Sequence, residues 1–184
     1  MIKTITFIII LFWNTNAKAN NLPSEQWTHQ THIWLSRAFV AEAGWDSKRD
    51  HIAIAYVIKR RWNRMKKRWD MIRFLDVVRN YCSGLGLQLT REPTDRQKWI
   101  RALSFKLDKP IGWPDNASWK KHRVLWKKAL RRAHDWYIGK YADPCNGKAY
   151  NWGGAMDIAR AKKLKLKPID CGETENIFYN SGEE

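Results

Sequence analysis

The stretch HIAIAYVIKRRW, residues 51–62, is apolar almost all the way round a helix from Ile52 to Ile58. A helix that is hydrophobic on every face has to be enclosed by other elements, so this stretch predicts a central buried helix with the rest of the chain packed around it. The chain has 184 residues and 44% hydrophobic content, which is enough for one packed core. We therefore expect a mainly helical fold.

Helical periodicity also appears on both sides of this stretch. Residues 27–43 repeat apolar side chains at helical spacing, and Gly44 is a suitable stop. Asp46 or Ser47 is expected to cap the central helix, with Asp50 completing a weak capping box. The remaining expectations are a long loop over residues 79–93, helices over 94–107, 119–137 and 155–163, and a hairpin over 164–179.

The first 19 residues have the pattern of a secretory signal peptide. A lysine near the start precedes an apolar run from Ile5 to Trp13, and AKA at 17–19 matches the small-x-small cleavage pattern. The apolar run is short for a membrane span, although an uncleaved signal anchor is an alternative. We expect export to the periplasm or the extracellular space, with a mature chain that begins near Asn20 and forms a single domain over residues 20–184.

The chain carries a formal net charge of +16, which falls to +14 once residues 1–19 are removed. Such a charge attracts polyanions, and outside a bacterial cytoplasm these include anionic cell-envelope polymers and lipid surfaces as well as nucleic acid. For any single basic run, such as residues 59–61, the alternative is a solvated surface that keeps the protein soluble. Charge alone does not choose among these partners.

Three cysteines allow at most one intramolecular disulfide. We favour Cys145–Cys171, because both lie in the glycine-rich final quarter, where closing a loop contributes about 3 kcal/mol to a region with little core. Cys82 is then unpaired, near the loop over residues 79–93. The cysteine spacing matches no zinc pattern, so we expect no metal. We also expect no cofactor.

Glu42 stands on the apolar face of the helix predicted over residues 27–43, with Phe39 and Trp45 as neighbours. Glutamate is seldom buried unless it is paired, so one interpretation is an ion pair with a nearby arginine. The candidates are Arg37, Arg49 and Arg60. The other interpretation is functional, because apolar neighbours and the negative end of a helix both keep a carboxyl protonated. A protonated carboxyl can donate its proton to a glycosidic oxygen.

The stretch WLSRAFVAEAGWDSKRDHIAIAYVIKRRW, residues 34–62, resembles the first catalytic motif of the bacterial cell-wall hydrolase family that includes the spore-cortex lytic enzymes. In that family a helix presents a glutamate in an Ala-Glu-Ala context and an apolar helix follows. NYCSGL at 80–85, ADPCNGKAYNWGG at 142–154 and ENIFYN at 175–180 match later motifs in part. The resemblance implies a lysozyme-like, mostly helical domain that cleaves the glycan strands of peptidoglycan, often as a lytic transglycosylase.

The resemblance implies that Glu42 is the catalytic residue. It also implies substrate-binding positions in a cleft, and these are Tyr81, Ser83, Tyr150 and Asn151. The chain departs from the family at three places, with Tyr81 instead of a glutamine, Tyr150 or Asn151 instead of a histidine, and Asn176 instead of the closing histidine.

Three tryptophans stand in or beside segments broken by glycine or proline, where an indole face suits stacking on a sugar ring. They are Trp45, Trp113 and Trp152. Packing in the core or at its rim is the alternative for each of them. We take Trp45 and Trp152 as substrate-binding candidates.

A glycoside hydrolase normally uses two carboxylates, whereas a lytic transglycosylase needs one, because the 6-hydroxyl of the muramyl sugar itself closes the ring. The candidates for a second carboxylate are Asp46, Asp50, Asp76 and Asp143. Asp46 is closest to Glu42 in sequence and is better explained as a helix cap. We therefore favour the mechanism with one carboxylate, and leave hydrolysis by a muramidase open.

The expected partners are the glycan strands of peptidoglycan, with anionic cell-envelope polymers as further ligands of a monomeric protein. The alternative function is that of an exported cationic protein that binds the wall or nucleic acid without catalysis. A nucleic-acid binder explains neither the signal peptide nor the Ala-Glu-Ala helix, so we do not expect nucleic acid as the partner.

Overall fold

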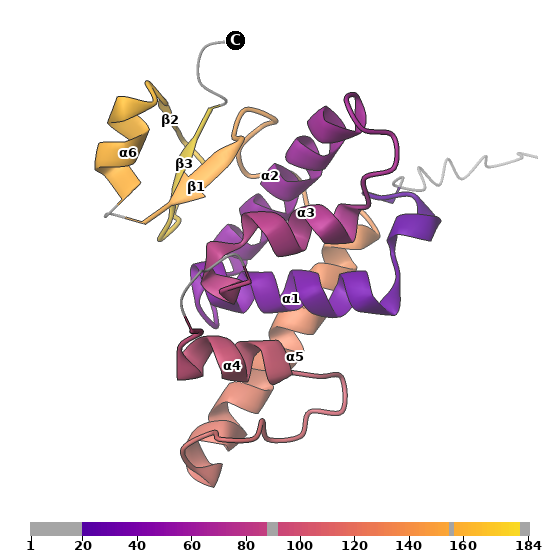
Figure 1. The fold of residues 1–184 in the computed structure, drawn as a ribbon, viewed down its shortest axis with the longest axis vertical. Coiled ribbons are helices and arrows are strands. Elements are labelled where there is room, and N and C mark those ends of the chain that lie inside the picture. The colour runs from indigo at the N-terminus through magenta and orange to yellow at the C-terminus, as the bar shows by residue number, and fades with distance from the viewer. Residues whose placement is uncertain (1–19, 88–91, 155–156, 181–184) are drawn as a thin grey trace, which may run out of the picture.

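The computed structural model describes residues 20–87, 92–154 and 157–180, so the predicted signal peptide lies outside the described residues. Over these residues the protein is mainly helical, with a three-stranded sheet close to the end of the chain (Figure 1). None of the described helices combines the length and the apolar character that crossing a bilayer requires. The helices are α1 (His29–Ala43), α2 (Lys48–Lys66), α3 (Phe74–Tyr81), α4 (Asp95–Ala102), α5 (Asn116–Tyr137) and α6 (Ile158–Lys163), with 3-10 turns η1 (Ser24–Gln26) and η2 (Ser83–Leu85).

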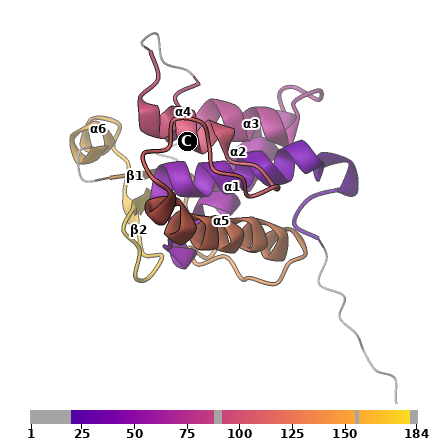
Figure 2. The same ribbon diagram turned by 90° about the horizontal axis from the view of Figure 1, so that it is seen from below.

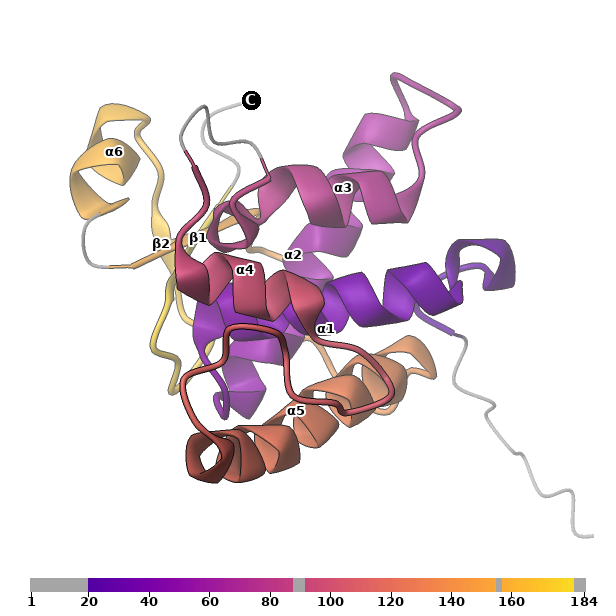
Figure 3. The same cartoon turned by 60° about the horizontal axis from the view of Figure 1, so that its bottom comes forward.

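Helix α2 contains the buried stretch that the sequence predicts. From Ile52 to Ile58 every residue except Tyr56 is buried, and Tyr56 is partly buried. Helix α1 shares the central position, because it packs against α2, α3, α4 and α5. Figures 2 and 3 show α1 running between α5 on one side and α3 and α4 on the other. The second half of α2, from Lys59 to Lys66, emerges from the core and carries most of the helix's basic residues.

The ends of α1 and α2 follow local signals in the sequence. Thr28 caps α1 by accepting a hydrogen bond from the amide of Thr31 over 3.1 Å. Gly44 ends α1 with φ 73°, a conformation that favours glycine. Ser47 is the N-cap residue of α2, so the interpretation of Asp46 as a helix cap is wrong. Asp46 instead pairs with Lys128 and Arg132 of α5.

Two other predicted helices have different bounds. Helix α4 begins with the predicted capping box of Thr94 and Gln97, but it ends at Ala102 rather than near residue 107. Leu103 turns the chain out of the helix into the core, where it is fully buried. The helix predicted over residues 119–137 begins earlier, at Asn116, because Asp115 accepts a hydrogen bond from the Ser118 amide and caps it.

The C-terminal sheet has the strand order β1-β3-β2, with both pairs antiparallel. Strands β2 (Pro168–Ile169) and β3 (Ile177–Tyr179) form the predicted hairpin, whereas β1 (Asn151–Gly153) is an addition that the sequence did not predict. The register pairs Trp152 with Phe178, which is buried. In Figures 1 and 3 the sheet and α6 lie together on one side of the helical body.

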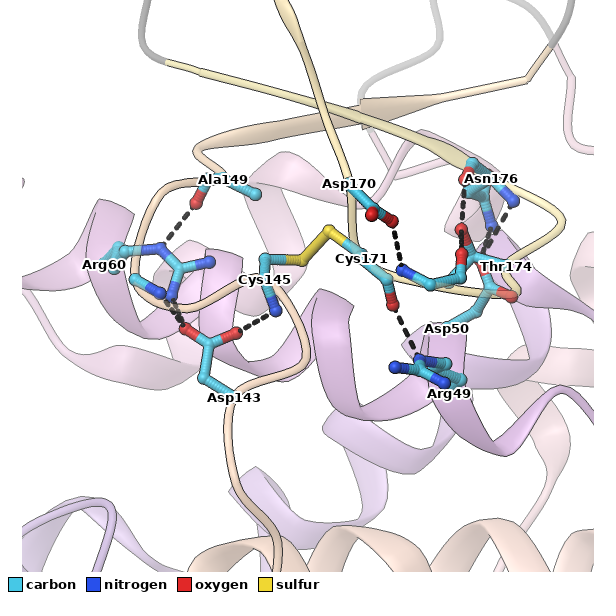
Figure 4. Close-up of a disulfide and its surroundings, with 12 residues drawn as sticks. Arg49, Asp50, Arg60, Asp143, Cys145, Ala149, Asp170, Cys171, Thr174 and Asn176 are labelled. Atoms are coloured by element: carbon cyan, nitrogen blue, oxygen red, sulfur yellow. Dashed lines mark hydrogen bonds and ion pairs between the residues drawn. A yellow bond between two sulfur atoms is a disulfide. The ribbon is translucent and has the colours of Figure 1, made fainter.

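Arg49 and the buried Asp50 of α2 hold the loop between β2 and β3, and a disulfide joins the same loop to the segment that follows α5 (Figure 4). The disulfide is the predicted Cys145–Cys171, and the backbone oxygen of Cys171 accepts a hydrogen bond from Arg49. Asp50, fully buried, accepts hydrogen bonds from the amides of Glu175 and Asn176, both over 2.9 Å. Because these contacts hold the loop between β2 and β3 against α2, the position of the whole sheet is fixed relative to α1. The third cysteine, Cys82, is free and buried.

Candidate active site

Glu42 lies in the last turn of α1, where its carboxyl group meets two segments distant in sequence. The amide of Gly84 in η2 donates a hydrogen bond to Oε1 over 2.6 Å. The indole Nε1 of Trp152 in β1 donates one to Oε2 over 3.1 Å. The backbone oxygen of Glu42 also accepts a hydrogen bond from Nδ2 of Asn176 over 3.2 Å. Glu42 therefore joins α1, η2 and the sheet at one point.

The close approach of η2 to α1 depends on glycine at position 84. A Cβ atom on Gly84 would lie 2.6 Å from the backbone oxygen of Ala41 and 2.9 Å from its carbonyl carbon. Backbone atoms cannot yield as a flexible side chain does, so any other residue would push η2 away from the helix. Only glycine therefore brings this backbone amide within hydrogen-bonding reach of Glu42.

The three arginines considered as ion-pair partners for Glu42 are all bound elsewhere. Arg37 donates to the backbone oxygen of Leu103, and Arg49 to that of Cys171. Arg60 pairs with Asp143. Within the described parts of the chain, Glu42 takes part in no ion pair, and both hydrogen-bond donors to its carboxyl are electrically neutral.

Burial raises the pKa of the Glu42 carboxyl above its ordinary value, because water is removed from the charged form. The hydrogen bonds from Gly84 and Trp152 favour the ionised form and oppose this shift, as does the positive charge of Arg96. The carboxylate of Asp157 adds to the increase through charge repulsion. The net direction is upward, so Glu42 holds its proton to a higher pH than an exposed glutamate does.

Each candidate for a second carboxylate has contacts that account for its position. Asp46 pairs with α5, and Asp50 holds the loop between β2 and β3. Asp76 forms a capping box with Arg73 at the start of α3, and Asp143 binds Arg60. The carboxylate whose charge reaches Glu42 is Asp157, just before α6, which the sequence analysis did not single out.

Arg61 of α2 gathers most of the predicted cleft residues around its guanidinium group. The group lies over the ring of Tyr81 at 4.6 Å and over the ring of Trp152 at 5.1 Å from each centroid. It also donates hydrogen bonds to the backbone oxygen of Tyr150 and to Oδ1 of Asn151. Arg61 thus contacts four of the predicted substrate-binding residues. In the sequence it is only one member of the basic run at residues 59–61.

Two cavities extend from this cluster along the exposed second half of α2. The first has a volume of about 280 Å³ and the second about 380 Å³, and they share Arg64, Arg68 and Tyr150. The other residues that line the first are Arg61, Met65, Trp69, Tyr81 and Asn151, and those that line the second are Arg60, Asn63 and Lys67. Glu42 lines neither cavity. Arg61 lines the first cavity and also interacts electrostatically with Glu42. Burial lowers the pKa of Arg61, and the negative charge of Glu42 opposes this shift.

The two remaining predicted substrate-binding residues, Ser83 and Trp45, differ in their position relative to Glu42. Ser83 is exposed and immediately precedes Gly84, so it stands at the edge of the contact with Glu42. Trp45 belongs to another aromatic cluster, where its ring meets His122 at 4.7 Å and Trp113 at 5.9 Å. Trp113 is buried in that cluster, which favours a packing role for it. The structure therefore brings Trp152, but not Trp45, to Glu42.

No set of three or more histidine, cysteine, aspartate or glutamate side chains within residues 20–87, 92–154 and 157–180 is arranged to hold a metal ion. The chemistry that the site offers is that of one carboxyl group with a raised pKa beside a cationic, aromatic cleft. The chain matches no family model, and no curated protein sequence or solved structure matches it either.

Proposed function

We propose that the protein cleaves the glycan strands of peptidoglycan, with Glu42 as the general acid. The observation that carries this proposal is the bonding of its carboxyl: two neutral donors hold it, without an ion pair among the described residues, in surroundings that raise its pKa. A glutamate that only balanced a buried arginine would have a lowered pKa. A raised pKa is what proton donation near neutral pH requires.

One carboxyl group is sufficient if the reaction is a transglycosylation. Glu42 gives its proton to the bridging oxygen as the bond from that oxygen to the anomeric carbon of the muramyl sugar breaks. The 6-hydroxyl oxygen of the same sugar then bonds to the anomeric carbon and returns its proton to Glu42, so no water is consumed. The Gly84 amide stays on Oε1 throughout and stabilises the carboxylate between the two transfers.

The proposal requires a movement at the site. Glu42 lines neither cavity, and the indole of Trp152 occupies Oε2. The Trp152 side chain therefore has to leave Oε2 when a sugar enters, which makes this oxygen the proton donor. Its ring would then be available to stack on the sugar.

The same proposal includes a lysozyme-like fold and export. A glutamate at the end of a helix of a packed helical body, in direct contact with a small sheet, supports the first. The Cys145–Cys171 disulfide supports the second, because structural disulfides persist in oxidising compartments.

The test compares wild type with Glu42→Gln on purified peptidoglycan, with Glu25→Gln of η1 as the matched control because Glu25 is exposed. Glutamine keeps the shape of the side chain but has no transferable proton, so cleavage should fall at least about a hundredfold. Mass spectrometry of the released muropeptides reports the mechanism, since a 1,6-anhydro end indicates transglycosylation and a reducing end indicates hydrolysis.

The thermal midpoint of each variant separates catalysis from folding. We expect Glu42→Gln to melt close to wild type, because no arginine of the described residues forms an ion pair with Glu42. A folded Glu42→Gln protein with undiminished cleavage would overturn the assignment. If Glu42→Gln unfolds, Glu42→Asp, which keeps a proton but shortens the side chain, has to retain measurable cleavage.

A wall-binding protein without catalysis is the second candidate, and the cationic lining of the two cavities favours it. It predicts that wild type sediments with peptidoglycan and releases no muropeptides. Its sedimentation would be the same for wild type and Glu42→Gln, so the cleavage assay decides between the two functions.

A further inference from the structure

Arg61 holds a positive charge in a partly buried position without an anion in contact. Its hydrogen-bond partners are two neutral oxygens, and its faces lie against two aromatic rings. Among the described residues no carboxylate lies within ion-pair distance of Arg61. A partly buried guanidinium group is costly unless an anion accompanies it. The side chain lines the first cavity, so the compensating anion can come from a ligand there.

At the second cavity Arg60 has an anion in contact, since it pairs with Asp143, but one of its N–H groups is not satisfied by the described residues. The Nε of Arg60 donates to the backbone oxygen of Ala149 and Nη1 to Asp143, but Nη2 is buried and has no hydrogen-bond partner among the described residues. Arg64, Lys67 and Arg68 complete the basic lining of this cavity. Of the described residues that line either cavity, none is an aspartate or a glutamate. Both cavities are therefore positively charged and lack an acidic side chain of their own.

The apolar residues that line the cavities indicate which kind of anion would bind there. Met65, Trp69 and Tyr81 line the first cavity beside Arg61, and Tyr150 stands between the two cavities. Such surfaces suit an anion carried on an aliphatic chain, and a guanidinium group binds a carboxylate through two parallel hydrogen bonds. In peptide-substituted peptidoglycan the sugar rings are uncharged and the lactyl carboxyl of muramic acid is an amide, so the free carboxylates are on the peptides.

We propose that these two cavities bind the carboxylates of the stem peptide, so that the substrate class is peptide-bearing rather than peptide-free glycan. This inference rests on the proposed function. The stem peptide would lie along the second half of α2, and Arg61 would face both the peptide and the neighbourhood of Glu42. The cleft then selects the strand by its peptide, while Glu42 acts on the sugar.

The test measures binding and cleavage separately. Calorimetry on wild type uses three probes, namely the disaccharide N-acetylglucosaminyl-N-acetylmuramyl with a tetrapeptide, the same disaccharide without peptide and with its lactyl carboxyl converted to the amide, and a glycerol phosphate oligomer. We expect the peptide-bearing probe to bind at least tenfold more tightly than the other two. Arg68→Gln should remove most of that advantage, and Arg123→Gln, an exposed arginine of α5, should leave it unchanged.

The outcomes distinguish this inference from the proposed function. Equal binding of the two disaccharides, or tighter binding of the phosphate oligomer, would overturn the stem-peptide site even if peptidoglycan were cleaved. Preferred binding of the peptide-bearing probe without cleavage would support the site and overturn the enzymatic proposal. Circular dichroism has to show that Arg68→Gln and Arg123→Gln are folded, and an equal effect of both would count against the site.

Discussion

The indole N–H of Trp152 donates a hydrogen bond to Oε2 of Glu42 over 3.1 Å and joins residues 110 positions apart in the sequence. A donor at this position favours the ionised carboxylate, whereas burial favours the protonated acid. Burial prevails, and the pKa of Glu42 is raised. Some neighbours of Glu42 therefore raise the pKa of its carboxyl and others lower it, and a substitution can remove each neighbour separately.

Trp152→Phe removes the donor and keeps an aromatic ring. We expect the pKa of Glu42 to rise further, because an influence that lowers it is lost. The rate of glycan cleavage should then persist to higher pH, since the general acid remains protonated. Carbon-13 NMR titration of labelled glutamate measures the shift directly, and Trp27→Phe near the start of α1 is the control. An unchanged or lowered pKa in Trp152→Phe would contradict the expectation.

Asp157→Asn should have the opposite effect. The charge of Asp157 raises the pKa of Glu42, so its removal should lower that pKa and move the high-pH loss of cleavage to lower pH. The same titration measures this change. If Asp157→Asn instead abolished cleavage at every pH, Asp157 would be a second catalytic carboxylate and the mechanism with one carboxyl group would be wrong.

Gly84→Ala should displace η2 from α1. The new Cβ would meet the backbone oxygen of Ala41 at 2.6 Å, and we expect a loss of about 1–3 kcal/mol in the free energy of unfolding. Gly154→Ala is the matched control, because a Cβ there meets no atom of the described residues within 4 Å, its chain neighbours aside. Denaturant unfolding measures both variants. Equal stability of the two would show that η2 yields without cost.

The buried His51 predicts a loss of stability in mild acid. Burial lowers its pKa from 6.5 to about 4, so the folded protein keeps it neutral where the unfolded chain would bind a proton. Stability from this group is complete above pH 6.5 and is lost as the pH falls towards 4, by about 3 kcal/mol in all. Unfolding measured between these pH values checks this, and His51→Gln should remove the pH dependence that this group contributes.

Removing the disulfide should loosen the C-terminal sheet. Cys145 and Cys171 are 26 positions apart, and opening a loop of this size costs about 3 kcal/mol of stability. Wild type should therefore melt at a lower temperature in the presence of a reductant. The double variant Cys145→Ala/Cys171→Ala should melt at that lower temperature with or without reductant. A wild type that is insensitive to complete reduction would refute the stabilising role.

The sequence predicted those features that local signals determine. Gly44 ends α1, Thr94 begins α4, and the two half-cystines of the final quarter form the disulfide. Helix α3 was missed because its first residue follows Arg73, which is not a usual capping residue, although its side chain binds Asp76. Strand β1 was missed because three residues carry almost no periodic signal, and its partner β3 is distant in sequence.

A residue of the candidate site could be predicted from the sequence only if its type is unusual among its sequence neighbours. Glu42 met that condition, as a carboxyl group in an apolar stretch. Arg61 did not, because a basic run resembles a solvated surface. That interpretation is wrong for residues 59–61, since Lys59 bonds Asn21, Arg60 bonds Asp143 and Arg61 bonds Tyr150. Which basic side chain turns inward depends on the oxygens that the tertiary fold places beside it.

The position of Trp152 in β1 and of Asn176 just before β3 determines how much of the chain must exist before the site can be complete. Glu42, Gly84 and the core of α2 leave the ribosome early, but the indole and the amide that complete the surroundings of Glu42 come from the last part of the chain. A helical body that folds before the sheet docks and Cys171 meets Cys145 therefore has an incomplete site. Translation thus delays assembly of the surroundings of Glu42 until nearly the whole described chain has been made.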